Sequence, residues 1–144
     1  MESITIQGRS FITGPALGSV LTSTEPLSFW GGYDWKTGEI IDRRHPLSGE
    51  IAKGKILAIP FTRGSSTTTA VLLEAIRAGT APNAIITTAT DLFFALASVV
   101  AMELYDKLIP LVAISESDFA KLQTHDQIEI KNDGKILVNS RKES

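Results

Sequence analysis

The sequence predicts an α/β domain with a β-rich core, a mixed sheet and two main helices. Its second half alternates apolar strand patterns with two helical patterns, in the β-α-β-α-β order that is typical of a parallel sheet. A C-terminal hairpin and an alternating N-terminal segment add antiparallel strands. The 144 residues are expected to form one domain with residues 139–144 as a polar tail, because this length suffices for a single core.

The first 50 residues contain strands and then a long irregular segment. Residues 4–7 alternate in polarity and predict a strand, which residues 11–12 continue. The glycine-spaced stretch 14–21 indicates an irregular or bulged strand. Residues 23–50 are rich in glycine, proline and aromatic residues, and a loop of this length in a small domain is uncommon unless it has a function.

The second half is regular. The predicted elements are strand 55–60, helix 66–78, strand 84–87, helix 91–104, strand 110–114 and a hairpin of residues 127–130 and 135–138. Gly79 is expected to end the first helix, and Thr90 or Asp91 to cap the second. The side of the second helix that we expect to be buried consists of Leu92, Leu96, Val99, Val100 and Leu104.

Composition excludes several classes of protein. The net charge of −2 and the absence of any long run of Lys and Arg argue against nucleic-acid binding. The longest apolar stretch, residues 92–102, is too short to span a bilayer, and no signal pattern opens the chain, so we expect a cytoplasmic protein that does not bind membranes.

The chain contains no cysteine, so it can hold neither a disulfide nor a thiolate-ligated metal or iron–sulfur cluster. His45 and His125 lie far apart, without the spacing of a metal site. If the activity requires a metal, another chain must supply it.

The most informative motif is the corner between strand 55–60 and helix 66–78. Arg63, Gly64, Ser65, Ser66 and Thr67 stand where a strand turns into a helix. The first backbone N–H groups of a helix have no partner within it and attract anions. A guanidinium, free amides and hydroxyls together predict an anion-binding corner with a candidate proton carrier. Ser65 and Ser66 also suit plain helix caps, and the residues alone favour that simpler role.

Other interpretations of this corner are weaker. A nucleotide-binding loop needs a Lys before the Ser or Thr, and a nucleophile elbow needs Gly-x-Ser-x-Gly; neither pattern is present. A self-sufficient hydrolase that uses Ser65 with His45 or His125 lacks a visible acid–histidine pair. The run Thr87-Thr88-Ala89-Thr90 follows the neighbouring predicted strand, Ser115 follows the third, and both are expected to line the same edge.

Several further motifs follow one another along the chain. They are Glu25-Pro26-Leu27-Ser28-Phe29-Trp30-Gly31-Gly32, Gly38-x2-Ile41-Asp42-Arg43-x-His45-Pro46-Leu47-x-Gly49-Glu50, Arg63-Gly64-Ser65-Ser66, Val71-Leu72-Leu73 and Gly79-x-Ala81-Pro82-x-Ala84-Ile85. With them, the sequence resembles the small, swivelling subunit or domain of aconitase X enzymes over residues 4–114. The chain departs from the family pattern after Ser66, where Thr68-Thr69 replace a Gly-Ser pair.

This resemblance implies a swivelling β/β/α domain that closes over a larger domain or a separate large subunit, which carries the cysteines of an iron or iron–sulfur centre. Family members dehydrate small hydroxy acids, namely cis-3-hydroxy-L-proline in bacteria and fungi and mevalonate 5-phosphate in archaea. The resemblance makes Ser65 the proton acceptor and places Arg63, Gly64, Ser66 and Thr67 at the substrate. We expect no cofactor on this chain and no activity without the large subunit.

The segment 98–105 is more similar to the bacterial hydroxyproline enzymes and favours that substrate. The alternatives are the small subunit of a mevalonate 5-phosphate dehydratase and a non-catalytic, anion-binding regulatory domain. For the partner interface we expect residues 42–46 and the aromatic loop of Phe29, Trp30 and Tyr33. Alternatively, Trp30, Trp35 and Tyr33 could simply cover one end of a barrel.

Overall fold

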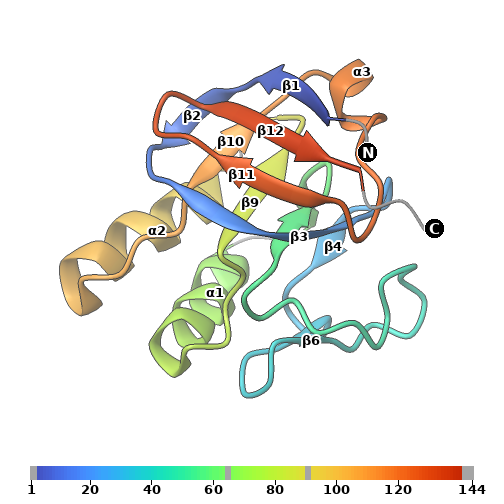
Figure 1. Ribbon diagram of the computed structural model, residues 1–144. Helices are drawn as coiled ribbons and strands as arrows, with labels where there is room; N and C mark the ends of the chain where they lie inside the picture. The colour runs from blue at the N-terminus through green and yellow to red at the C-terminus, as the bar shows by residue number, and fades with distance from the viewer. Residues whose placement is uncertain (1–2, 64–65, 90–91, 141–144) are drawn as a thin grey trace.

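The computed structural model describes residues 3–63, 66–89 and 92–140. An eight-stranded sheet in the order β1-β12-β11-β3-β7-β9-β10-β2 curls into a nearly closed barrel (Figure 1). The strands of this sheet are β1 (Ser3–Gln7), β2 (Arg9–Ile12), β3 (Ala16–Thr22), β7 (Ile56–Ala58), β9 (Ala84–Thr87), β10 (Leu111–Ala113), β11 (Gln127–Ile130) and β12 (Lys135–Asn139). Four short strands pair outside it, namely β4 (Leu27–Ser28), β5 (Tyr33–Asp34), β6 (Glu39–Ile40) and β8 (Thr62–Arg63).

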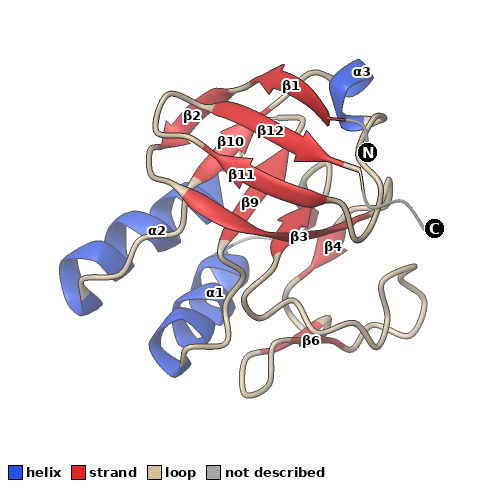
Figure 2. Cartoon of the chain, viewed as in Figure 1, coloured by secondary structure: helices blue, strands red, loops and turns tan. Residues whose placement is uncertain are grey.

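The sheet is mixed, as the sequence predicts. Strands β3, β7, β9 and β10 run parallel, whereas β1, β12, β11 and β3 pair antiparallel, and β2 pairs antiparallel with β10. Helix α1 (Ser66–Ala78) connects β7 to β9, and α2 (Leu92–Tyr105) connects β9 to β10. The two helices pack side by side below the sheet (Figure 2), while the short α3 (Glu116–Phe119) follows β10.

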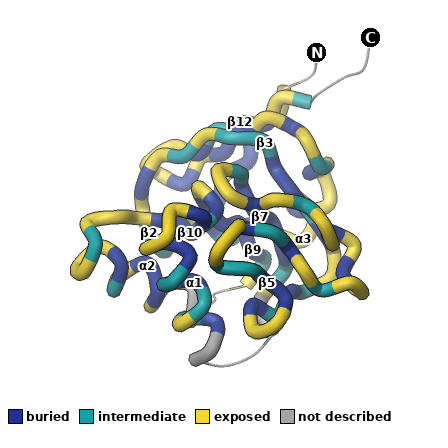
Figure 3. Tube along the Cα trace, turned by 90° about the horizontal axis from the view of Figure 1, so that it is seen from below, coloured by how far each residue is buried: buried dark blue, intermediate teal, exposed yellow. Residues whose placement is uncertain are grey.

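Two apolar cores lie on the two faces of the parallel strands. Along β7, Ile56 and Ala58 point into the barrel, whereas Leu57 and Ile59 point toward the helices. This alternation follows from the period of two in a strand. Strands β7 and β9 are therefore buried on both faces, which explains their continuous apolar sequence (Figure 3).

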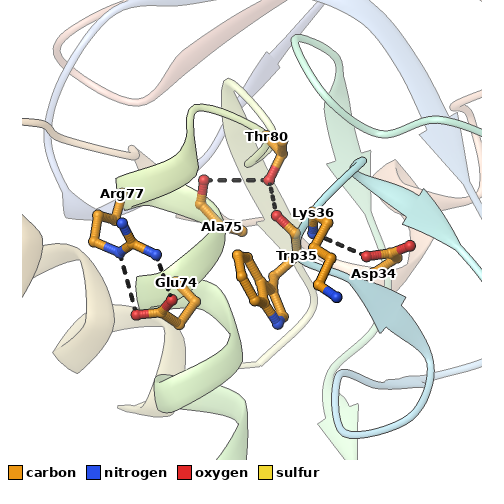
Figure 4. A network of polar contacts seen from close by, with 7 residues as sticks. All are labelled: Asp34, Trp35, Lys36, Glu74, Ala75, Arg77 and Thr80. Atoms are coloured by element: carbon orange, nitrogen blue, oxygen red, sulfur yellow. Dashed lines mark hydrogen bonds and ion pairs between the residues drawn. The ribbon is translucent and has the colours of Figure 1, made fainter.

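The segment of residues 23–50 is attached to the end of α1 by buried apolar side chains and by hydrogen bonds. The Tyr33 hydroxyl donates to the Thr80 carbonyl oxygen at 2.8 Å. The Thr80 hydroxyl lies 2.5 Å from the Trp35 carbonyl oxygen and 3.3 Å from that of Ala75 (Figure 4). The contacts of Tyr33 and Trp35 join this segment to Thr80, two residues after the end of α1, so the segment is part of the folded body.

Two of the three aromatic residues that we expected at a partner interface belong to the core. Phe29 and Tyr33 are 0% and 3% exposed, and their rings stack with centroids 4.9 Å apart. Their expected role at an interface is therefore wrong, and the alternative of covering the core is right for Tyr33 and for Trp35, which packs partly buried against the core. Trp30 differs, because it is 71% exposed.

The expected buried side of α2 is also wrong. Ala97, Ser98 and Ala101 are the fully buried residues of its described part, whereas Leu96, Val99 and Leu104 are exposed and Val100 is half-buried. The side chain of Leu92 lies outside the described part, as do the candidate caps Thr90 and Asp91. Small residues face α1 because closely packed helices leave little room between them. Within the described residues, neither α2 nor any other helix has the length and apolar character needed to cross a bilayer.

Candidate functional site

The predicted corner lies where β8 ends and α1 begins. Strand β8 pairs in parallel with β4, with Ser28 opposite Arg63, and α1 starts at Ser66. Gly64 and Ser65 lie outside the described residues, and only the backbone is described for Arg63, Ser66 and Thr67. A strand before the corner and a helix after it are therefore confirmed, whereas the roles of these five residues stay predictions.

The corner adjoins the carboxyl ends of the parallel strands, where α/β folds place their ligands. The backbone N–H and the hydroxyl of Thr88 both donate to the Pro60 carbonyl oxygen, at 3.2 and 3.3 Å. The N–H of Ile114 donates to the Thr87 carbonyl oxygen at 2.8 Å. These bonds bring the segments that follow β7, β9 and β10 together at one edge of the sheet. Pro60, at this edge, precedes Arg63 by three positions in the sequence.

Two open pockets lie at this edge, and Thr88 lines both. The first has a volume of about 260 Å³ and is mostly apolar, with Pro60 and Phe119 in its wall. The second, of about 360 Å³, is more polar and includes Arg9 and Ser115. The sequence prediction that Thr88 and Ser115 line the edge is therefore confirmed. Thr87 is fully buried, and its hydroxyl donates to the Ala89 carbonyl oxygen.

Arg9 is a residue of this edge that the sequence patterns did not reveal. Its guanidinium lies over the Phe11 ring, 5.3 Å from the centroid, and pairs with no carboxylate among residues 3–63, 66–89 and 92–140. The only sequence signal was a lone Arg between two predicted strands. Asp118, in the wall of the same pocket, binds Lys121 at 2.9 Å; this hydrogen bond, aided by the Lys121 charge, lowers the pKa of Asp118.

Thr68, in the first turn of α1, carries a buried hydroxyl without a hydrogen-bond partner among the described residues. It is 0% exposed and lies on the same side of α1 as Leu72 and Ala75, facing the core. Such groups are uncommon in folded proteins, because an unpaired buried hydroxyl loses its bonds to water.

His45 has a structural role in the segment expected at the partner interface. The Leu47 N–H donates to His45 Nδ1 at 3.1 Å, so the proton of the neutral ring lies on Nε2 and is donated to the Glu25 carbonyl oxygen, also at 3.1 Å. Both ring nitrogens are thus occupied, and the described part of the chain contains no group of three or more His, Cys, Asp or Glu side chains able to hold a metal. An iron centre does not fit the described residues.

Sequence relatives of the chain fall into two groups. A cis-3-hydroxy-L-proline dehydratase of Pseudomonas aeruginosa is 45% identical over 108 residues, which are 75% of this chain but only 19% of that protein. The phosphomevalonate dehydratase small subunit of Methanothermobacter thermautotrophicus is 39% identical over 126 residues, covering 85% of this chain and 91% of that protein. This chain thus spans about a fifth of the first relative and nearly all of the second.

A solved structure agrees with the fold. The crystal structure of Thermococcus kodakaraensis aconitase X in its holo-form superposes with a TM-score of 0.84 and 29% sequence identity, covering 95% of this chain and 99% of that chain. Residues 5–138 match the family of the aconitase X swivel domain. The fold and the match over nearly the whole length lead to one conclusion: this chain belongs to the aconitase X swivel-domain family.

Proposed function

We propose that this chain is the small subunit of an aconitase X-type hydro-lyase that dehydrates a small hydroxy acid. The observation that carries the proposal is the family match over residues 5–138, which includes the strand-to-helix corner. The carboxyl edge beside this corner has open pockets lined by hydroxyl groups, as a ligand site requires.

Ser65 is assigned the role of proton acceptor. Dehydration removes a proton from the carbon next to the carboxylate and a hydroxyl group from the following carbon. A serine hydroxyl is a weak base, but the residue directly before the first helical residue can be stabilised as an alkoxide by the free N–H groups of the first turn. Since α1 begins at Ser66, Ser65 holds this place in the sequence.

Arg63, Gly64, Ser66 and Thr67 are assigned to the substrate. The Arg63 guanidinium would bind the carboxylate, and backbone and hydroxyl donors at the start of α1 would complete the anion site. Release of the hydroxyl group needs an electrophile. Because the described residues of this chain offer no metal site, the iron or iron–sulfur centre is assigned to a large subunit.

We favour cis-3-hydroxy-L-proline as the substrate, because the Pseudomonas aeruginosa relative is the more similar in sequence, at 45% against 39% identity. Mevalonate 5-phosphate is the second candidate. It is favoured by a different observation, namely that the archaeal small subunits match over nearly their whole length.

The test is co-expression of this chain with a large subunit from the same organism, followed by assays of the purified complex with each substrate. Ser65→Ala should abolish turnover while the complex still forms, as judged by size-exclusion chromatography. Ser48→Ala, which removes an exposed hydroxyl from the segment of residues 23–50, serves as the matched control and should retain turnover. Undiminished turnover by Ser65→Ala would contradict the assigned role, and an isolated chain with full activity would contradict the need for a large subunit.

A further inference from the structure

The outer side of helix α2 is an apolar surface formed by Leu96, Val99 and Met102, called the α2 patch below. We propose that the α2 patch is the surface on which the large subunit docks. This inference rests on the proposed function and extends it, because it assigns a place on this chain where the partner binds.

The α2 patch is apolar where a helix in contact with water is normally polar. Leu96, Val99 and Met102 are 52%, 50% and 46% exposed, and their spacing of three residues aligns them along one side of the helix. Glu103 is the one charged residue in the sequence of α2. A helix that is apolar on all sides is normally buried on all sides, so the outer side of α2 is expected to be covered in the working protein.

The orientation of α2 is fixed from its inner side. The Ser98 hydroxyl donates to the Ile109 carbonyl oxygen at 2.8 Å and accepts from the Ile109 N–H at 3.1 Å. Ala97 and Ala101, on either side of it, are fully buried. The helix cannot turn its large apolar side chains inward without breaking two buried hydrogen bonds and forcing larger groups into the space of two alanines.

The position of α2 indicates the large subunit as the occupant. Helix α2 follows β9 at the carboxyl edge of the sheet and packs beside α1, which starts at the corner. A subunit that brings its reacting centre to the corner therefore lies beside the start of both helices, and the α2 patch begins at Leu96, in the second turn of α2. Relatives of this chain are named small subunits, and in the Pseudomonas aeruginosa relative the matched part is 19% of a longer chain.

A second copy of this chain fits the α2 patch less well. Three half-exposed side chains on one helix are too small a surface for a stable dimer, which needs about 800 Å² from each partner. A large subunit that covers both the α2 patch and the carboxyl edge can reach that area.

The test compares lysine substitutions on two elements in the complex with the large subunit. Leu96→Lys should weaken the affinity of the chain for the large subunit at least about tenfold. The double variant Leu96→Lys, Met102→Lys should weaken it further, because each lysine places a charge in a desolvated contact. The matched control is Leu17→Lys on β3. Leu17 is 66% exposed and faces Glu129 of β11, which forms an ion pair with Lys131 at 3.2 Å, so a lysine there lies on an exposed, charged surface and should leave the affinity unchanged.

The outcomes separate this inference from the proposed function. Circular dichroism and the melting temperature of each isolated variant should match those of the wild-type chain, and the truncation Leu96→Ala, Met102→Ala provides a second variant that keeps a strong helix former at both positions. Wild-type affinity of all three α2 variants for the large subunit, or self-association of the chain through the α2 patch with unchanged binding of the large subunit, would overturn the docking surface alone. A wild-type chain that does not bind the large subunit would overturn the proposed function as well.

Discussion

Replacing Thr68 by valine should stabilise the protein. The Thr68 hydroxyl is fully buried and has no hydrogen-bond partner among the described residues. An unpaired buried polar group costs about 1–3 kcal/mol. Valine has nearly the same shape and a similar helix propensity, so the exchange replaces this hydroxyl by a methyl group at little other cost. We expect Thr68→Val to raise the free energy of unfolding by about 1 kcal/mol or more.

Thr80→Val is the matched control, and it should change the free energy of unfolding in the opposite direction. Thr80 is 5% exposed, and its hydroxyl contacts the Trp35 and Ala75 carbonyl oxygens. The same substitution there removes a hydrogen bond and leaves the Trp35 carbonyl oxygen without this donor. It should lower the free energy of unfolding by about 1–2 kcal/mol.

Thermal and urea unfolding of the isolated chain measure both changes. For a domain of this size, each kcal/mol shifts the melting temperature by about 3 °C, so the two variants should move in opposite directions from the wild-type value. If Thr68→Val destabilises the chain as much as Thr80→Val does, the Thr68 hydroxyl has a partner in solution and the reasoning is refuted.

Three further predictions follow from the site and its supports. Burial raises the pKa of the Tyr33 phenol, so its stabilising contribution is complete below pH 10, the pKa of an unfolded tyrosine, and declines as the pH rises further. Tyr33→Phe should therefore show a smaller loss of stability between pH 9 and 11 in urea titrations; an identical decline would contradict this. Gly38 and Gly49 have φ angles of +83° and +88°, but only at Gly38 would a Cβ approach other atoms, with the Thr80 carbonyl oxygen at 2.7 Å. Gly49→Ala should cost about 1 kcal/mol and Gly38→Ala clearly more, and equal costs would refute the close approach. Arg63→Ala should raise KM about tenfold or more with a smaller effect on kcat, and an unchanged KM would count against a role in substrate binding.

The regular elements could be predicted because they carry strong local signals. Helix 66–78 and strand 84–87 coincide with α1 and β9, and Gly79 ends α1 in the left-handed conformation, as expected. The predicted hairpin agrees with β11 and β12 to within a residue. In these segments the apolar period and the turn residues favour the same structure.

Other features could not be predicted, because they depend on contacts between distant parts of the chain. The two-residue strands β4 and β8 are too short to show a period, and they form only because residues 35 positions apart are brought together. Helix α3 has a local signal that was missed, since the Ser115 hydroxyl accepts from the Asp118 N–H as an N-cap. Periodicity also failed on α2, because a helix with apolar residues on all sides does not indicate which side faces its own domain.

The pairing of β1 with β12 places Ser3 opposite Asn139, so two points that are 136 positions apart along the chain are neighbours in space (Figure 1). A linker attached at either point would leave from the same place on the barrel. Joining this unit to another polypeptide, in either order, therefore needs no rearrangement of its strands. The same architecture can thus serve as a free-standing polypeptide or as a segment of a longer one, and a covalent fusion of the two subunits is a practical goal for protein engineering.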